Sequence, residues 1–354
     1  MYINTHIHTF RDIDVPRKFL PLQLVRFLAS KPGYYLTAKI LNNLNPFSDE
    51  DIFNRYLKFV RIGRMGNQQQ IFENCSRFYP KDTKFVILPM DMAYMGAGKV
   101  PRAYADQLAE LGKLKHTHPE IIPFIHIDPR RKNVLDLLKK SVEDWGFKGV
   151  KLYPPLGYFP YDERLYPIYE YCQQNNLSVI SHCSPYNPVH YKGSKKELFE
   201  LLSKSDKPIK TKGKSRKVLC SNFSHPNNYK RILTDFSNLN ICLAHFGSEY
   251  FWNKYLDNPE MEDNWFVIIK DMLAKYDNLY SDISFTLNNE GFFPLLKVLL
   301  GNEKIRNKIL FGSDYYMVET KTTELKFSID LRAYLGEDLF SEIAINNPHK
   351  FLKL

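Results

Sequence analysis

Short apolar segments alternate with amphipathic ones along the whole chain. Eight of the short segments are rich in β-branched and aromatic residues, which is typical of strands. They are Tyr2–His6, Phe85–Met90, Ile121–Ile127, Gly149–Tyr153, Ser178–His182, Asn240–His245, Leu279–Ile283 and Lys308–Gly312. The pattern therefore predicts eight strands spread from one end of the chain to the other.

Segments with helical periodicity lie between most of these strands. They are Ala103–Lys115, Val134–Trp145, Leu165–Asn175, Trp265–Lys275, Phe293–Leu300 and Glu324–Leu335. Strand–helix alternation repeated eight times predicts an α/β fold of the (β/α)₈ barrel type. An open doubly wound sheet is the alternative, but it usually has a glycine-rich turn after the first strand, where this chain carries histidines.

Two connections, residues 9–83 and 184–238, are too long for simple loops between a strand and a helix. Their periodic apolar stretches are Leu20–Leu28, Ile52–Val60, Lys195–Leu202 and Tyr229–Phe236. We interpret both connections as helical insertions, after strand 1 and strand 5, and the first as a candidate lid over the barrel. No Gly/Ser-rich linker separates the halves of the chain, so residues 1–354 are predicted to form one domain with insertions.

Composition indicates an ordinary globular protein, since the 354 residues are 44% hydrophobic and 25% charged. No apolar run reaches membrane-spanning length and no signal peptide is evident, so we expect no membrane partner. The five cysteines are scattered and form no Cys-x-x-Cys pair. They are predicted to be reduced thiols of a cytoplasmic protein.

The formal net charge of +10 makes nucleic acid a partner to consider. Much of the positive charge lies in one stretch, residues 204–217, which has no interleaved aromatic residues and no nucleic-acid motif. We interpret this stretch as a solvated loop, with a funnel for anionic substrates as the alternative. The expected partner is a small-molecule substrate and not a nucleic acid.

The first strand ends in the sequence His6-Ile7-His8. Side chains two residues apart on a strand point to the same side, and their Cα atoms lie roughly 6.6 Å apart. Two imidazoles at that spacing can close around one metal ion, with each nitrogen at about 2.0–2.1 Å.

Polar residues of the same kind stand near the ends of four other predicted strands. They are Lys151 on the fourth, His182 on the fifth, His245 on the sixth and Asp314 after the eighth. Active sites of (β/α)₈ barrels form where the carboxyl ends of the strands meet. The sequence therefore predicts a shared metal site at that end of the barrel.

This order of residues resembles the metal-dependent amidohydrolase superfamily. Within it, the chain is similar to the amidohydrolase-2 branch, which includes aminocarboxymuconate semialdehyde decarboxylase. Asp-Pro-Arg-Arg at residues 128–131 and Asn-Asn-Pro-His-Lys-Phe-Leu at 346–352 add to the resemblance. The long connection before the second strand departs from simple members of the branch, which puts the substrate pocket in doubt.

Imidazole and carboxylate ligands suit a borderline dication with one coordination position left open to water. His6, His8, His182 and Asp314 are the predicted ligands, of one Zn²⁺ or alternatively Mn²⁺. The ion lowers the pKa of its water toward ~7, and Asp314 accepts the proton of that water. His245 polarises the substrate carbonyl or carries the proton. We therefore predict hydrolysis of a C–N or C–O bond in a small, anionic substrate.

Lys151 separates two versions of the site. In some members of the superfamily that the chain resembles, a lysine on the fourth strand is carbamylated and bridges two metal ions. His182 and His245 would then hold the second ion. In the amidohydrolase-2 branch such a lysine is often unmodified and the site binds one metal, which is the version that we favour. Lys151 would then pair with an aspartate or with a substrate carboxylate.

Two other functions are compatible with the same residues. One is a non-oxidative decarboxylase, in which the metal and His245 stabilise charge as carbon dioxide leaves. The other is a catalytically silent barrel that acts as a binding protein. The oligomeric state is open: barrels of this type often pair as homodimers, but no interface stripe stands out in the sequence.

Four further residues are candidates for substrate contact: Asp91, His126, Arg130 and Tyr153. For Asp91 and His126, a structural hydrogen bond is as well supported as substrate contact. For Arg130, the equally supported alternative to substrate contact is a surface ion pair. Tyr315 and Cys183 are also candidates to line the pocket. His116-Thr117-His118 repeats the His-x-His spacing but ends a helical segment before a proline, so we expect it to be solvated. No metal role is expected for His190, His225 or His349.

Overall fold

The computed structural model describes residues 1–19, 52–187 and 189–354. The described residues form eight parallel strands whose order in the sheet is their order in the chain. They are β1 (Ile3–Ile7), β2 (Lys84–Ile87), β3 (Ile121–Ile127), β4 (Gly149–Leu152), β5 (Ser178–His182), β6 (Ile241–Ala244), β7 (Leu279–Asp282) and β8 (Ile309–Leu310). The predicted (β/α)₈ barrel is confirmed.

The first and last strands of the sheet are brought together by hydrogen bonds. Thr5 N donates to Phe311 O at 2.9 Å, and Asp314 N donates to His6 O at 2.8 Å. The second of these bonds ties the end of β1 to the segment after β8. Two residues predicted to act together, His6 and Asp314, are therefore neighbours through the backbone itself.

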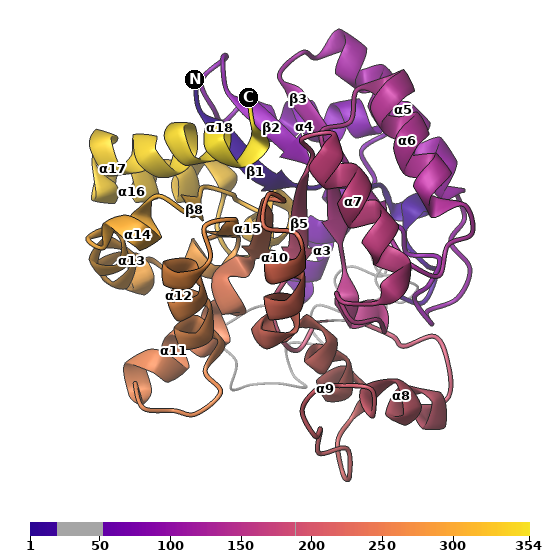
Figure 1. The fold of residues 1–354 in the computed structure, drawn as a ribbon. Coiled ribbons are helices and arrows are strands. Elements are labelled where there is room, and N and C mark those ends of the chain that lie inside the picture. Colours follow the sequence, from indigo (N-terminus) through magenta and orange to yellow (C-terminus); the bar gives the residue numbers. More distant parts are fainter. Residues whose placement is uncertain (20–51, 188) are drawn as a thin grey trace.

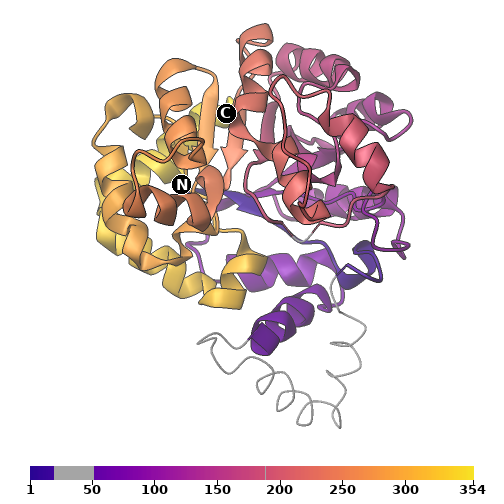
Figure 2. The ribbon, with the colours of Figure 1, turned by 90° about the horizontal axis from the view of Figure 1, so that it is seen from below.

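Helices surround the strands, as Figures 1 and 2 show. In the described residues they are α3 (Ile52–Gly63), α4 (Gln68–Ser76), α5 (Tyr104–Thr117), α6 (Val134–Trp145), α7 (Tyr166–Gln174), α8 (Lys195–Leu202), α9 (Arg216–Ser221), α10 (Lys230–Asp235), α11 (Ser248–Asp257), α12 (Trp265–Lys275), α13 (Phe293–Leu300), α14 (Glu303–Arg306), α15 (Tyr315–Lys321), α16 (Glu324–Leu335), α17 (Glu337–Ser341) and α18 (Asn347–Leu352). A short π-helical turn, Glu342–Asn346, links the last two. The predicted bounds of α6, α8, α12, α13 and α16 agree with the structure.

Most residues of the strands are apolar because the side chains on both faces of each strand are buried. A smaller buried cluster contains alternate strand positions, such as Ile122 and Phe124 or Cys242 and Ala244. A larger cluster joins the intervening positions, such as Ile87, to the helices. The first cluster fills the barrel and the second packs the barrel against its helical layer, so both faces of each strand are buried.

The predicted strands differ from the observed ones mainly at their ends. β2 stops at Ile87 and β8 at Leu310, where the predicted segments continued to Met90 and Gly312. Beyond these points the chain leaves the sheet and forms the loops above it. The boundaries differ because apolar residues continue from the strand into the cavity wall, where Met90 lies.

The long connections after β1 and β5 contain helices, as expected. Predicted Ile52–Val60 lies within α3, and predicted Tyr229–Phe236 contains α10. Predicted Leu20–Leu28 falls outside the described residues, so the lid and the bounds of the two insertions stay predictions.

Other features agree with the composition. The five cysteines are free and buried. The lysines and the arginine of residues 204–217, which follow α8 and extend into the first turn of α9, are exposed. In the described part of the chain, no helix combines the length and apolar character needed to cross a bilayer.

Candidate active site

A cavity of about 530 Å³ opens at the carboxyl ends of the strands. Five of the six residues predicted to share a site contribute to its lining: His8, Lys151, His182, His245 and Asp314. The sixth, His6, lies beneath the cavity and is fully buried. The barrel therefore brings together residues from β1, β4, β5, the end of β6 and the segment after β8.

The hydrogen bonds of His6 fix which of its nitrogens carries the proton. Its Nδ1 lies 2.9 Å from Oδ2 of Asp282, and both side chains are 0% exposed. Because a carboxylate accepts, Nδ1–H donates and Nε2 keeps its lone pair. Nε2 of His6 has no hydrogen-bond partner among the described residues. A buried nitrogen lone pair in this state is suited to a cation.

His8 and His245 are oriented in the same way. Nδ1 of His8 donates to Leu88 O at 2.6 Å, and Nδ1 of His245 donates to Ser284 O at 3.0 Å. A carbonyl oxygen can only accept, so both rings keep the lone pair of Nε2. This is the arrangement in which metal-binding histidines are held by a second group.

His182 and His245 face each other through two ring nitrogens. Nδ1 of His182 lies 3.0 Å from Nε2 of His245. On the far side, Nε2 of His182 donates to Oδ1 of Asn187 at 2.8 Å, and Nδ2 of Asn187 donates to Ser184 O, which fixes the amide. Both facing nitrogens therefore carry lone pairs, and they need a proton or a metal ion between them.

Burial keeps all four imidazoles neutral near pH 7. It lowers the pKa of His6 to about 4 and that of His245 to about 3. It also lowers the pKa of His8 and of His182 well below the usual value. Neutral imidazole is the form that binds metal, so these side chains need no deprotonation before they coordinate.

Asp314 and Lys151 are buried ionisable groups with unsatisfied polar atoms. Among the described residues, neither Oδ1 of Asp314 nor Nζ of Lys151 has a hydrogen-bond partner. Burial raises the pKa of Asp314 to about 7, although the Lys151 charge opposes the shift. Burial lowers the pKa of Lys151 to about 8, against the attraction of Asp282 and Asp314. Buried charges without partners are costly, which indicates that a ligand completes this site.

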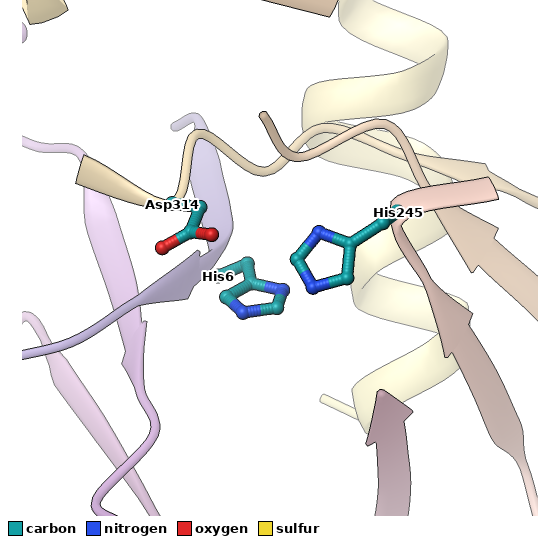
Figure 3. Close-up of side chains that lie close together, drawn as sticks. All are labelled: His6, His245 and Asp314. Carbon is teal, nitrogen blue, oxygen red and sulfur yellow. The ribbon is translucent and has the colours of Figure 1, made fainter. Parts of the chain in front are cut away.

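His6, His245 and Asp314 form a candidate metal-binding group, and their ligand atoms lie within 4.8 Å of one another. Figure 3 shows their side chains facing the same space from three different strand ends. Nε2 of His8 lies 3.8 Å from Oδ1 of Asp314, at the edge of this group. Nitrogen and carboxylate donors in this number fit a divalent ion such as Zn²⁺. In this group His245, and not His182, stands with His6 and Asp314, so the predicted ligand set stays a prediction.

Asp282 is a functional residue that the sequence reasoning missed. Besides His6, it receives the backbone N–H of His245 at 2.9 Å and that of Ser284 at 3.1 Å. Burial by itself would raise the pKa of Asp282, but the His6 ring and the bond from His245 outweigh it and hold that pKa well below its usual range. A carboxyl group ending an apolar strand at the same level as His182 and His245 was the available signal.

The backbone around the cavity is strained. Five non-glycine residues that line the cavity have positive φ: Tyr186 at 59°, His245 at 69°, Ser248 at 80°, Phe285 at 58° and Asp314 at 60°. Such conformations cost about 1–3 kcal/mol each and persist where the surrounding structure imposes them. Their concentration here supports a functional role for this cavity.

Gly312 allows the close approach between the end of β8 and β1. A Cβ atom at position 312 would lie 2.8 Å from Cβ of His6 and 3.4 Å from its backbone nitrogen. Any larger residue would push His6 away from Asp314. The requirement for glycine therefore comes from packing against His6.

The secondary candidates divide into one cavity residue and three that serve the structure. Tyr153 lines the cavity, and its ring centroid is 4.6 Å from that of His182. Asp91 accepts from Nε of Arg131 at 2.5 Å, and His126 Nδ1 accepts from Asp91 N at 2.7 Å. Arg130 binds both carboxylate oxygens of Asp128, at 2.8 and 2.5 Å.

Those three residues, Asp91, His126 and Arg130, do not line the cavity. Of the other pocket candidates, Tyr315 and Cys183 also do not line it, whereas Tyr316 does. His116 is exposed, and Nδ1 of His118 pairs with Oε1 of Glu120 at 3.1 Å. His225 pairs with Asp263 at 2.9 Å, away from the cavity.

Comparison with known proteins gives one family. The family model described as "Amidohydrolase" matches residues 93–354. The match begins after His6 and His8, so these two residues rest on the geometry described above. No curated protein matches the chain.

Several solved structures share the fold. An uncharacterized TIM-barrel protein from Bordetella bronchiseptica aligns at a TM-score of 0.58 with 16% identity, over 99% of this chain and 98% of that chain. A 4-oxalomesaconate hydratase from Rhodopseudomonas palustris aligns at 0.54 with 14% identity, over 100% and 96%. An amidohydrolase from Burkholderia multivorans with bound zinc aligns at 0.52 with 11% identity, over 100% and 99%.

Proposed function

We propose that this chain, which belongs to the amidohydrolase family of metal-dependent hydrolases, cleaves a C–N or C–O bond in a small molecule. The observation that carries the proposal is the convergence of ligand atoms on one space. Nε2 of His6 and Oδ1 of Asp314 are buried without hydrogen-bond partners among the residues that the structure describes, and Nε2 of His8 and of His245 stand beside them. Each of these rings is held by a hydrogen bond at Nδ1.

We assign one divalent ion to His6, His8 and Asp314, with His182 as the fourth ligand and Zn²⁺ as the first choice of metal. Mn²⁺ is the alternative. An ion bound there supplies a Lewis acid and lowers the pKa of a coordinated water toward ~7. The zinc in the Burkholderia multivorans structure supports this choice of metal.

Asp314 and His245 are the proton-handling residues in this proposal. Asp314 lines the cavity beside the proposed ion, where a carboxylate oxygen can accept a proton from the attacking water and return it to the leaving group. His245 presents Nε2 toward the cavity and can accept a hydrogen bond or carry a proton there. Lys151 presents Nζ toward the charge that develops on the substrate oxygen.

A two-metal site is the second version of the proposal. The pKa of Lys151, about 8, leaves part of its amine uncharged near neutral pH, and only the uncharged amine can react with carbon dioxide. A carbamylated Lys151 would be a second anionic ligand, and the facing nitrogens of His182 and His245 would hold the second ion. Metal stoichiometry separates the two versions.

Decarboxylation is the alternative reaction, and one observation favours it. The single cation among the described lining residues, Lys151, lies in a cavity with mostly apolar walls. Moving a substrate carboxylate from water into such a cavity weakens its solvation, which favours loss of carbon dioxide. Release of carbon dioxide without incorporation of oxygen from H₂¹⁸O would establish this reaction in place of hydrolysis.

The test is the metal content of protein purified without chelators, measured by inductively coupled plasma mass spectrometry. About one zinc or similar ion per chain is expected, and about two would favour the carbamylated form. Asp314→Asn should lose the metal, whereas Asp263→Asn should keep it. Asp263 is a matched control, because it too has φ of 60° and a histidine neighbour, His225.

Two further variants separate ligand from base. His182→Asn is expected to lose the metal, and His245→Asn is expected to keep it. If His245→Asn loses the metal and His182→Asn keeps it, His245 is the fourth ligand and His182 is the proton carrier. That result would agree with the group of His6, His245 and Asp314. No metal in the purified protein, and none taken up from added zinc or manganese, would overturn the proposed function.

A further inference from the structure

We infer that the substrate has a planar apolar body, the size of one or two aromatic rings, and carries at most one negative charge at its reacting end. This inference rests on the proposed function for the position of the reacting end. It narrows the expectation of a small anionic substrate, because the cavity is suited to one charge and an aromatic body. The argument starts from the walls of the cavity.

One wall is a cluster of three rings next to His8. Phe10 stacks on Tyr316 with centroids 4.8 Å apart and planes inclined by 17°. Phe59 of α3 contacts Tyr316 at 5.2 Å, and Phe10 lies 5.5 Å from the His8 ring. Rings held in this way present flat surfaces, which favour stacking or edge contacts with another ring.

The other walls and the mouth are also apolar or aromatic. Met90, Met92, Tyr153, Phe285 and Met317 contribute to the lining. At the mouth, Tyr186 and Tyr250 meet edge to face at 5.3 Å, and the two rings are 42% and 39% exposed. Methionine side chains adapt to the shape of an apolar ligand and contact aromatic rings favourably.

Charge is scarce in the cavity. Among the described lining residues, Lys151 is the only lysine or arginine, and the carboxylates are Asp314 and Glu249. The nearby arginines are committed elsewhere, because Arg130 pairs with Asp128 and Arg131 with Asp91. Against the described part of the lining, a second carboxylate on the substrate would therefore be buried without a countercharge, which costs several kcal/mol in an apolar site.

The volume sets the size of the body. Benzene fits a cavity of about 150 Å³ in an engineered apolar core. The cavity here, at about 530 Å³, leaves room for a larger ligand together with the metal and a water. A body of one or two rings fits this volume. A long flexible chain would make fewer contacts with the flat ring surfaces of the walls.

The test measures binding of unreactive probes to the full-length, zinc-loaded protein by isothermal titration calorimetry. The probes are 2-naphthoate, naphthalene-2,6-dicarboxylate and adipate. We expect 2-naphthoate to bind about tenfold or more tightly than either dicarboxylate, as burial of a ring body predicts. Equal or tighter binding of a dicarboxylate would overturn the inference, and so would failure of 2-naphthoate to bind.

Two variants locate the bound probe. Phe59→Ala is expected to weaken the binding of 2-naphthoate about fivefold to tenfold, because one ring of the wall is lost. Phe199→Ala is the matched control, since Phe199 is also a partly buried phenylalanine but lies on α8 outside the cavity. Equal effects of the two substitutions would contradict the inference.

A second pair serves if Phe59→Ala does not fold. Tyr250→Ala removes a ring from the mouth, and Tyr334→Ala removes a ring of similar exposure, 40%, from α16. The ring centroid of Tyr250 lies 5.3 Å from that of Tyr186 and 5.0 Å from that of Phe251, and the ring centroid of Tyr334 lies 5.5 Å from that of Phe293. Only Tyr250→Ala should weaken the binding of 2-naphthoate. Equal affinities of the two variants for this probe would contradict the inference.

The metal content of the same samples reports on the proposed function separately. A protein that holds zinc but prefers dicarboxylates would keep its proposed function and lose this inference. A protein that binds 2-naphthoate at the aromatic wall but takes up no metal would lose the proposed function and keep the aromatic binding site.

Discussion

The chain contains the pattern His-x-His twice, and the two copies behave differently. His6 and His8 stand at the end of β1, while His116 and His118 stand at the end of α5. In both copies a carboxylate lies beside Nδ1 of one ring: Asp282 at 2.9 Å from His6, and Glu120 at 3.1 Å from His118. The spacing and the carboxylate partner are therefore shared.

Burial and convergence are what differ. His6 and Asp282 are 0% exposed, whereas His118 and Glu120 are 19% and 30% exposed. His245 and Asp314 meet the first copy at the ends of other strands, and no such group surrounds the second copy among the described residues. The comparison teaches that a metal site depends on what other strands bring to the motif and on the exclusion of water.

The largest expected effect separates the two copies directly. His6→Asn/His8→Asn should lower the zinc content from about one per chain to below about one tenth, since two ligands are lost. His116→Asn/His118→Asn should leave the zinc content unchanged. Mass spectrometry of the metal measures both, with circular dichroism to confirm that each variant is folded. Retention of zinc by the first variant would remove the distinction between the copies.

The next largest effect is expected from substitution of the carboxylate that lies beside each copy of the pattern. Asp282→Asn should weaken zinc binding about 10–100-fold, because an amide no longer fixes the Nδ1–H form of His6. Glu120→Gln, the corresponding change beside His118, should have no effect. Competition with a chromogenic zinc chelator measures both affinities. Equal affinities would mean that Asp282 supports the fold and not the ligand.

Packing around the first copy gives a smaller effect, on stability. Gly312→Ala should lower the free energy of unfolding by about 1–3 kcal/mol, because the added Cβ overlaps His6 and the site must shift. Gly63→Ala is the control, since its Cβ would meet only ordinary contacts, the nearest at 3.4 Å. Urea unfolding measures both. A wild-type stability for Gly312→Ala would show that β8 can move away from β1 at little cost.

The smallest effect tests burial of a carboxyl group without a metal role. Glu324 is 0% exposed, and burial raises its pKa to about 7, although bonds from Ser313 and Tyr79 oppose the shift. Between pH 4.5 and pH 7 the folded protein keeps a proton here that the unfolded chain loses. Stability should therefore fall as pH rises through this range.

The contribution of Glu324 from pH 5 to pH 7 should be on the order of 1–2 kcal/mol. Glu324→Gln removes it, so the difference in unfolding free energy between wild type and variant should grow with pH in favour of the variant. Urea unfolding at pH 5, 6 and 7 provides the measurement. A difference that stays constant with pH would show that Glu324 titrates normally in the folded protein.

Much of the fold was predictable because its signals are local. Apolar runs and helical periodicity located the strands and most helices, and five helices have their predicted bounds. The site residues on strand ends were also predictable, because the ends of parallel strands meet in a barrel. Asp282 was missed although it ends an apolar strand, because the sequence does not show what a single acid contacts. Its role appears only when β7 stands beside His6 and His245.

Tyr316 and Phe59 were missed for a similar reason. Apolar residues of a core and of a substrate cavity have the same composition and periodicity, so no sequence pattern separates them. The predicted substrate contact by Arg130 shows the reverse difficulty. An arginine after a strand is suited to a carboxylate, and here Asp128, two residues away, is the carboxylate that it binds.

The amino-acid sequence by itself determined the class of fold, the residues at the strand ends and the kind of chemistry that they can support. Period-two and period-3.6 patterns and the chemistry of imidazole act over a few residues, so the chain order is enough to read them. The tertiary structure decided which histidines share one space, which nitrogen each presents and which charges lack a partner. Those depend on burial and on contacts between residues that are hundreds of positions apart, such as His6 with Asp282.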